Sequence, residues 1–366
     1  MTGECQRGAN CRNQHDCIKV AFQYPIPNNV PVKTLQLLNS PHGPLLLSGS
    51  TDKSVKAFLI PNGLSLLSNI SNAGSGTAVG SVQNIQVKDN TIMWAVEEPV
   101  PTDEGNPDIS VGIVYLVDIN NMNSKLPLQI SPDRPYTHIQ QVRAFIVEKV
   151  QDQIFVMTGG GEGTIRTWKF DQATSRFQVL ATLEGHLRDV TALWFDGTNH
   201  LWSGSTDRSI KVWDVHNYTC AATFCLTATE TARGHSNVVT CFEAIPHDGG
   251  DRYLASGGGD GNVIIWGADS GDYFGTFSHG NVIISTMKVI LDASGHHILI
   301  VAVTNGKLFL RDCRDFSLIC TLESRCQPSF VWGIVDLAQA NLNNHFVTSG
   351  DDGKLIVWNL NQPLLS

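Results

Sequence analysis

The chain repeats one pattern of polar and apolar positions. An eleven-residue segment recurs in which a small hydroxyl residue precedes a turn containing an acid, usually Gly-rich, and then a strand of alternating residues. Alternation with a period of two is typical of a half-buried β-strand, and a turn of this kind joins antiparallel strands in a hairpin. The copies are SGSTDKSVKAF at 48–58, TGGGEGTIRTW at 158–168, SGSTDRSIKVW at 203–213, SGGGDGNVIIW at 256–266 and TSGDDGKLIVW at 348–358.

Two weaker copies lie in the gaps, GIVYLVD around Tyr115 and Leu116 and GKLFLRD around Phe309 and Leu310. The spacing between successive strand ends is close to the roughly 40–50 residues of a four-stranded propeller blade. Because almost no stretch has apolar residues at helical spacing, an α/β enzyme is disfavoured. The pattern predicts an all-β, seven-bladed β-propeller over residues 18–366. Its third strands end near residues 58, 116, 168, 213, 266, 310 and 358.

The best copy runs from Gly185-His186 to Trp213-Asp214 and resembles the WD-repeat family, whose blade signature runs from Gly-His to Trp-Asp. The resemblance implies that a histidine, a serine or threonine, the turn aspartate and the tryptophan form a buried hydrogen-bonded set in a blade. Such polar groups need partners when they are buried, so we assign them to stability. The matching positions are His186, Ser203, Asp207 and Trp213 in blade 4, and His235, Ser256, Asp260 and Trp266 in blade 5.

Some blades depart from this signature. Blade 3 has His138 and Thr158 but carries Glu162 where the family has the aspartate. Blades 1, 2, 6 and 7 lack a convincing Gly-His, so we expect them to depend more on apolar packing. The last blade is one strand short after Trp358, and residues 18–24 (IKVAFQY) are predicted to supply that strand.

Serine, histidine and aspartate recur together as they do in hydrolase triads. A catalytic constellation is needed once, whereas a structural one is needed in every blade, so we predict that the protein is not an enzyme. No GxSxG, GxxxxGK[ST] or HExxH motif is present, and we expect no small-molecule substrate. The glycine triplets at 159–161 and 257–259 are interpreted as hairpin turns, because they precede strands and not helices.

Net charge bears on the class of partner, and cysteine content bears on the cellular compartment. The net charge of −9 means that the body of the protein repels a phosphate backbone, so any contact with nucleic acid must be local. Nine cysteines, an odd number in a long chain, favour a reducing compartment. No apolar run resembles a secretory signal or a membrane span, and we therefore expect the nucleus or the cytoplasm and no membrane.

Residues 1–17 contain Cys5, Cys11 and His15, with Cys17 nearby. The spacing resembles the last three ligands of a CCCH zinc finger, and together with the propeller it resembles the zinc-finger (CCCH) WD-repeat proteins. This resemblance implies a zinc ion and binding to RNA. The first cysteine of the finger is missing, and structural zinc is held by four ligands, so three interpretations stay open: an incomplete or vestigial finger, a working zinc site and a chance match of the spacing.

Loops carry function on a propeller, because its strands form the blades. Two insertions are candidate sites for protein partners: the acidic, proline-rich residues 97–110 and residues 227–233. Both also fit solvated, variable loops. We therefore expect a non-catalytic scaffold or adaptor, with association with RNA through residues 1–17 as an additional possibility. The alternative is a substrate receptor of a cullin-type ubiquitin ligase, but His216 stands where the WDxR mark of such receptors has arginine.

Overall fold

The computed structural model describes most of the chain from Ile18 to Leu360. In the described residues the secondary structure is 28 β-strands and one short 3-10 helix, η3 (Ala338–Ala340). Among these residues no helix has the length and apolar character needed to cross a membrane. The described ranges are 18–26, 29–40, 43–60, 64–71, 82, 84–88, 91–100, 109–118, 121–128, 136–150, 153–171, 173–174, 176–226, 233–246, 252–323 and 330–360.

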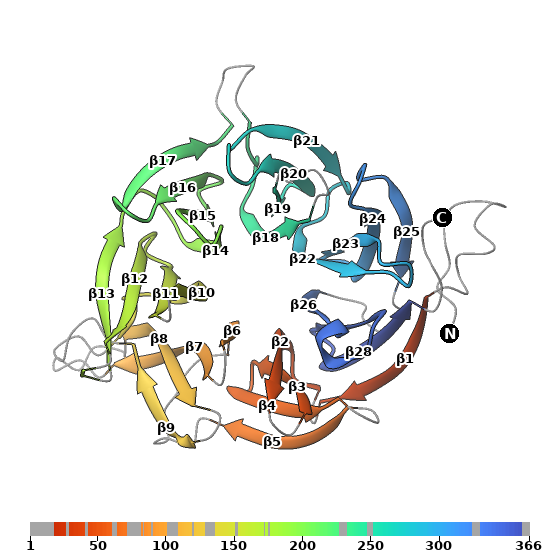
Figure 1. Ribbon diagram of the computed structural model, residues 1–366, viewed down its shortest axis with the longest axis horizontal. Helices are drawn as coiled ribbons and strands as arrows, with labels where there is room; N and C mark the ends of the chain where they lie inside the picture. The colour runs from red at the N-terminus through yellow and green to blue at the C-terminus, as the bar shows by residue number, and fades with distance from the viewer. Residues whose placement is uncertain are drawn as a thin grey trace. The chain divides into compact units, whose positions relative to one another are not determined.

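The strands form seven four-stranded sheets, and the fold is an all-β, seven-bladed β-propeller, which confirms the predicted class (Figure 1). The described chain divides into two compact units. One unit consists of Leu47–Ala57 and Ser68–Val239 and holds blades 2, 3 and 4. Its strands are β6 (Asn84–Lys88), β7 (Thr91–Val100), β8 (Ile109–Asp118) and β9 (Asn121–Pro127); β10 (Val142–Val150), β11 (Gln153–Gly160), β12 (Ile165–Asp171) and β13 (Arg176–Leu183); and β14 (Val190–Phe195), β15 (His200–Ser205), β16 (Ile210–Asp214) and β17 (Thr219–Phe224).

The other unit consists of Met1–Leu46, Phe58–Leu67 and Thr240–Ser366 and holds blades 5, 6 and 7. Blade 5 is β18 (Val239–Ile245), β19 (Tyr253–Gly258), β20 (Asn262–Gly267) and β21 (Tyr273–Ser278), and blade 6 is β22 (Ile284–Leu291), β23 (His297–Val303), β24 (Lys307–Asp312) and β25 (Leu318–Glu323). Blade 7 contains β26 (Val331–Asp336), β27 (His345–Gly350) and β28 (Lys354–Leu360). Blade 1, whose residues belong to both units, is β2 (Val32–Ser40), β3 (Gly43–Ser50), β4 (Ser54–Leu59) and β5 (Ser65–Ser71).

The fourth strand of blade 7 comes from the start of the described chain. Strand β1 (Ile18–Pro25) pairs antiparallel with β28, from Ile18 opposite Leu360 to Pro25 opposite Lys354. This confirms the prediction that residues 18–24 complete the last blade. The added strand covers an edge of β28 that would otherwise expose unpaired backbone groups.

Within each unit, apolar side chains fill the space between neighbouring blades. In one cluster Met157 and Ile165 of blade 3 pack with Val190 and Trp213 of blade 4, all of them buried. The alternating pattern of β16 produces this packing, since Ile210, Val212 and Trp213 are buried and Lys211 is only half-buried.

Close packing also explains part of each glycine triplet. Gly159 and Gly160 end β11, and Gly257 and Gly258 end β19, so only Gly161 and Gly259 lie in the predicted hairpin turns. A Cβ on Gly159 would lie 2.6 Å from Val190 Cγ1, so glycine lets the first strand of the next blade approach.

The predicted insertions and zinc ligands fall only partly within the described residues. In the 97–110 insertion, β7 and β8 stay paired as far as Val100 opposite Ile109, so residues 97–100 and 109–110 are strand and not loop. Residues 101–108, residues 227–232 and the cluster of Cys5, Cys11 and His15 lie outside the described residues.

Candidate interaction surface on blade 4

Blade 4 contains the polar set predicted from its sequence. Trp213 Nε1 donates a hydrogen bond to Ser203 Oγ at 2.8 Å, and Ser203 Oγ lies 2.7 Å from His186 Nε2. His186 Nδ1 lies 3.0 Å from Asp207 Oδ2. With the Nδ1–H tautomer, each donor in this chain meets an acceptor, in the order indole, hydroxyl, imidazole, carboxylate. The set links the last strand residue of the repeat to the turn and to the loop that enters the blade.

The connectivity of Ser203, His186 and Asp207 is that of a hydrolase triad, but its accessibility is not. Ser203 is 0% exposed, and its oxygen already accepts the indole N–H of Trp213. A nucleophile must reach the carbonyl carbon of a substrate, and this hydroxyl has no route to one. In this geometry the set stabilises the blade.

Blade 3 builds the same set with a glutamate. His138 Nε2 lies 2.8 Å from Thr158 Oγ1, which accepts the indole N–H of Trp168 at 2.9 Å, and His138 Nδ1 lies 2.6 Å from Glu162 Oε1. Burial acts to raise the pKa of Glu162, but hydrogen bonds from His138 and Arg166 outweigh it and lower that pKa to about 2. Burial lowers the pKa of His138, so its imidazole stays neutral at neutral pH. Glu162 therefore takes over the role of the aspartate.

The contact between indole and hydroxyl recurs in blades 5 and 7. The indole of Trp266 donates to Ser256 Oγ and that of Trp358 to Thr348 Oγ1, both at 2.9 Å. In blade 1 the tryptophan is replaced by Phe58, which has no N–H group. There the buried Ser48 Oγ has no hydrogen-bond partner among the described residues.

Blade 6 places a charged residue in the position of the tryptophan. Arg311 lies opposite Leu299, as Trp213 lies opposite Leu201, so the register puts Arg311 and not Leu310 at this position. Its guanidinium carbon lies 4.2 Å from the ring centroid of Phe277, and its Nε donates to His279 Nε2 at 3.3 Å. Burial and the charge of Arg311 lower the pKa of His279 to about 4.

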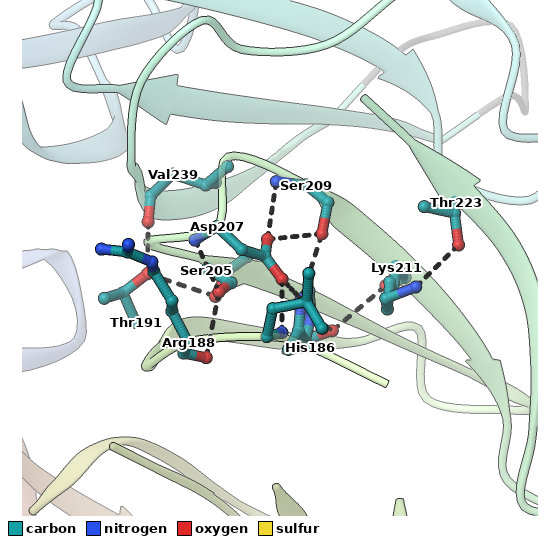
Figure 2. A network of polar contacts seen from close by, with 12 residues as sticks. His186, Arg188, Thr191, Ser205, Asp207, Ser209, Lys211, Thr223 and Val239 are labelled. Carbon is teal, nitrogen blue, oxygen red and sulfur yellow. Dashed lines mark hydrogen bonds and ion pairs between the residues drawn. The ribbon is translucent and has the colours of Figure 1, made fainter. Parts of the chain in front are cut away.

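On blade 4 the same set also holds a surface loop in place. Asp207 accepts a hydrogen bond from the backbone N–H of Leu187 at 2.9 Å. It accepts another from the backbone N–H of Ser209 at 2.8 Å (Figure 2). Ser205 Oγ donates to the carbonyl of Arg188 at 3.2 Å. Burial opposes the charged form of Asp207, but the bonds from His186, Leu187 and Ser209 prevail and hold its pKa well below the usual range. The loop at 184–189 is thereby held against the turn between β15 and β16.

A pocket of about 570 Å³ opens where this loop and turn meet the segment that leads into blade 5. We call it the blade 4 pocket, and its exposed apolar residues are Leu187, which is 87% exposed, and Leu226, which is 51% exposed. Arg188 and Arg208 are exposed beside them, and within the described part of the chain neither guanidinium has an ion-pair partner. The other lining residues are Thr206, Asp207, Cys225, His235 and Ser236.

The pocket relates to the sequence predictions in two ways. His186, Ser203, Asp207 and Trp213 come together as predicted, and in the sequence residues 227–233 stand between the lining residues Leu226 and His235. By contrast, neither Leu187 nor Arg208 was predicted to be functional. The available signal was an apolar residue directly after Gly185-His186, in a connection that should be polar.

Comparison with known proteins finds repeats of one family and several distant relatives. The family described as WD domain, G-beta repeat matches residues 27–58, 177–214 and 226–267, so the match does not reach residues 1–17. Mitochondrial division protein 1 of Kluyveromyces lactis is 31% identical over 135 residues, which cover 32% of this chain and 19% of that protein. Protein tipD of Dictyostelium discoideum is 25% identical over 215 residues, 56% of this chain and 30% of that protein.

Pre-mRNA-processing factor 19 of Mus musculus is 33% identical over 102 residues, 28% of this chain and 18% of that protein. In each case the aligned region spans less than a third of the relative's length.

Proposed function

Because the chain is a WD40-repeat β-propeller protein, we propose that it is a non-catalytic scaffold that binds other proteins in assemblies. The observation that carries this proposal is the blade 4 pocket, where Leu187 is held in the open by the backbone hydrogen bond to Asp207. An exposed apolar side chain beside a preformed pocket loses contact with water when a partner covers it, which favours association. Rigid support of the loop keeps the entropic cost of binding low.

The proposal is tested by comparing the partners of matched variants. Proteins that crosslink to the wild-type chain in cells are identified by mass spectrometry, next to Leu187→Glu and the control Leu291→Glu, whose leucine is 39% exposed. We expect Leu187→Glu to lose most of the partners and Leu291→Glu to keep them, with both variants melting like the wild type. The scaffold proposal is contradicted if the wild-type chain captures no protein in greater amount than an unrelated propeller does. Recovery of cullin-ligase subunits favours the alternative of a ubiquitin-ligase receptor.

A second candidate function is association with RNA through residues 1–17. Its support is the spacing of Cys5, Cys11 and His15, which fits part of a zinc site. Metal analysis of the full chain and a salt titration of RNA binding, each repeated after deletion of residues 1–17, test it. A metal-free protein whose affinity for RNA does not change on deletion contradicts it.

The expected compartment is the nucleus or the cytoplasm. The five cysteines in the described ranges are free thiols, which is compatible with reducing conditions. Fluorescence imaging of the tagged full chain checks this expectation, and accumulation in a secretory compartment contradicts it.

A further inference from the structure

One position in the turn between the second and third strands has a left-handed backbone in six blades. Glycine adopts this conformation without strain, whereas a residue with a Cβ does so at a cost in free energy. Four blades have glycine there and two have a cationic residue. The residues are Gly163 (φ +83°), Gly261 (φ +75°), Gly306 (φ +80°), Gly353 (φ +67°), Lys53 (φ 69°) and Arg208 (φ 74°).

Among the described residues, no ion pair of Arg208 compensates for the strain of its backbone. Its backbone N–H donates to Ser205 O at 3.1 Å, and a glycine would make that same bond. Its side chain is exposed, lines the blade 4 pocket and forms no ion pair with any described residue. The cationic side chain kept in this unfavourable conformation lines a pocket, and the two observations together point to a role in binding.

The charges of the pocket indicate what it binds. The carboxylate of Asp207 is occupied by His186, Leu187 and Ser209, so the groups directed at a ligand are the guanidinium groups of Arg188 and Arg208. This local excess of positive charge contrasts with the net charge of −9 of the whole chain. Arginine forms strong, charge-assisted hydrogen bonds with carboxylates and phosphates, and the net charge of −9 disfavours a nucleic acid, so the carboxylates of a protein are the favoured ligand.

We propose that the blade 4 pocket binds an acidic segment of a partner protein, in which carboxylates contact Arg188 and Arg208 and a bulky apolar side chain covers Leu187 and Leu226. This inference rests on the proposed scaffold function and specifies the chemistry of its partner. The apolar contact supplies area buried from water, and the arginines select against neutral and basic segments.

The test uses a labelled peptide library in which Asp or Glu flanks a central Leu or Phe. Two control libraries are matched to it. In one, Asn or Gln replaces the acids, and in the other, Ser replaces the central residue. Binding to the full chain is measured by fluorescence anisotropy at low and physiological salt. We expect only the acidic library with an apolar centre to bind, with an affinity that falls as salt rises.

Arg208→Gly separates recognition from folding, because glycine removes the side chain and suits the turn. We expect its affinity for the bound peptides to fall about tenfold, since it removes one charge-assisted contact. Its melting temperature should not fall. The matched control is Lys53→Gly, the same change in the same conformation on blade 1, which should leave binding unchanged.

Equal binding of the acidic and amide libraries overturns the proposal, as does unchanged affinity in Arg208→Gly or an affinity loss that comes with a lower melting temperature. Failure here can be distinguished from failure of the scaffold. If no library binds while Leu187→Glu still loses cellular partners, the acidic specificity is wrong and the scaffold stands; if that variant also keeps every partner, the blade 4 surface is wrong as well.

Discussion

Ser203 and Ser48 occupy the same position of the eleven-residue repeat, and the same substitution at each should have different effects on stability. Both are 0% exposed, so Ser→Ala removes the same buried atom from each. In blade 4 the change leaves the indole N–H of Trp213 and Nε2 of His186 without a partner. Each orphaned buried group costs about 1–3 kcal/mol, so we expect Ser203→Ala to destabilise by about 2–6 kcal/mol.

In blade 1 the hydroxyl of Ser48 has no hydrogen-bond partner among the described residues. A buried hydroxyl without a hydrogen bond destabilises the fold, so its removal in Ser48→Ala should be neutral or stabilising by about 1 kcal/mol. For a chain of 366 residues, an unfolding entropy of about 2.1 cal/mol/K per residue gives about 0.8 kcal/mol per kelvin. Calorimetry should show a fall in Tm of about 3–8 °C for Ser203→Ala and no fall for Ser48→Ala. Equal shifts in the two variants would refute the view that the hydrogen bonds of the set, and not its packing, stabilise the blade.

Three further predictions concern single features of the fold. Deletion of residues 1–24 removes most of β1 and should lower Tm by several degrees, whereas deletion of 1–17 should not; equal melting curves contradict the role of this strand. His279 has a pKa of about 4 in the folded chain and about 6.5 in the unfolded chain. Because the unfolded chain takes up this proton first, the free energy of unfolding should fall by about 3 kcal/mol as the pH falls from 6.5 to 4. Denaturant titrations of His279→Phe should lack this decline, and a decline of the same size in that variant contradicts the assignment. Gly261→Ala, at φ +75°, would also drive its Cβ into the carbonyl of Gly280, and we expect a loss of about 3 kcal/mol or more. The matched change Gly295→Ala, at φ +80° in open space, should cost only about 1–2 kcal/mol; equal losses on denaturant titration contradict the clash.

Most of the fold could be predicted from the sequence, because the repeat marks one hairpin in each blade. The strand pairing of residues 18–24 was also predictable, since the last blade was one strand short. The role of Glu162 was not: the side chain is longer than an aspartate, and only the geometry of the turn decides whether it reaches His138.

Register explains another difference between the sequence and the structure. A count of apolar residues suggests Leu310 as the end of its repeat, but pairing with Leu299 assigns Arg311 to that position. The blade 4 pocket was beyond sequence reasoning for a related reason. It combines residues from three connections, and no local pattern shows that Leu187, Arg208 and Leu226 line one space.

The pairing of β1 with β28 has a consequence for synthesis of the protein. About 340 residues separate Ile18 from its partner Leu360, and at about 5–20 residues per second the ribosome needs roughly 20 to 70 s to make them. During that interval the backbone of β1 lacks its paired strand β28, although Tyr24 can already pack on Phe58 and each hairpin of the other blades can form as soon as it emerges. We therefore expect the nascent chain to expose the unpaired backbone edge of β1 until β28 has emerged, and chaperones that hold extended peptides to act at this step.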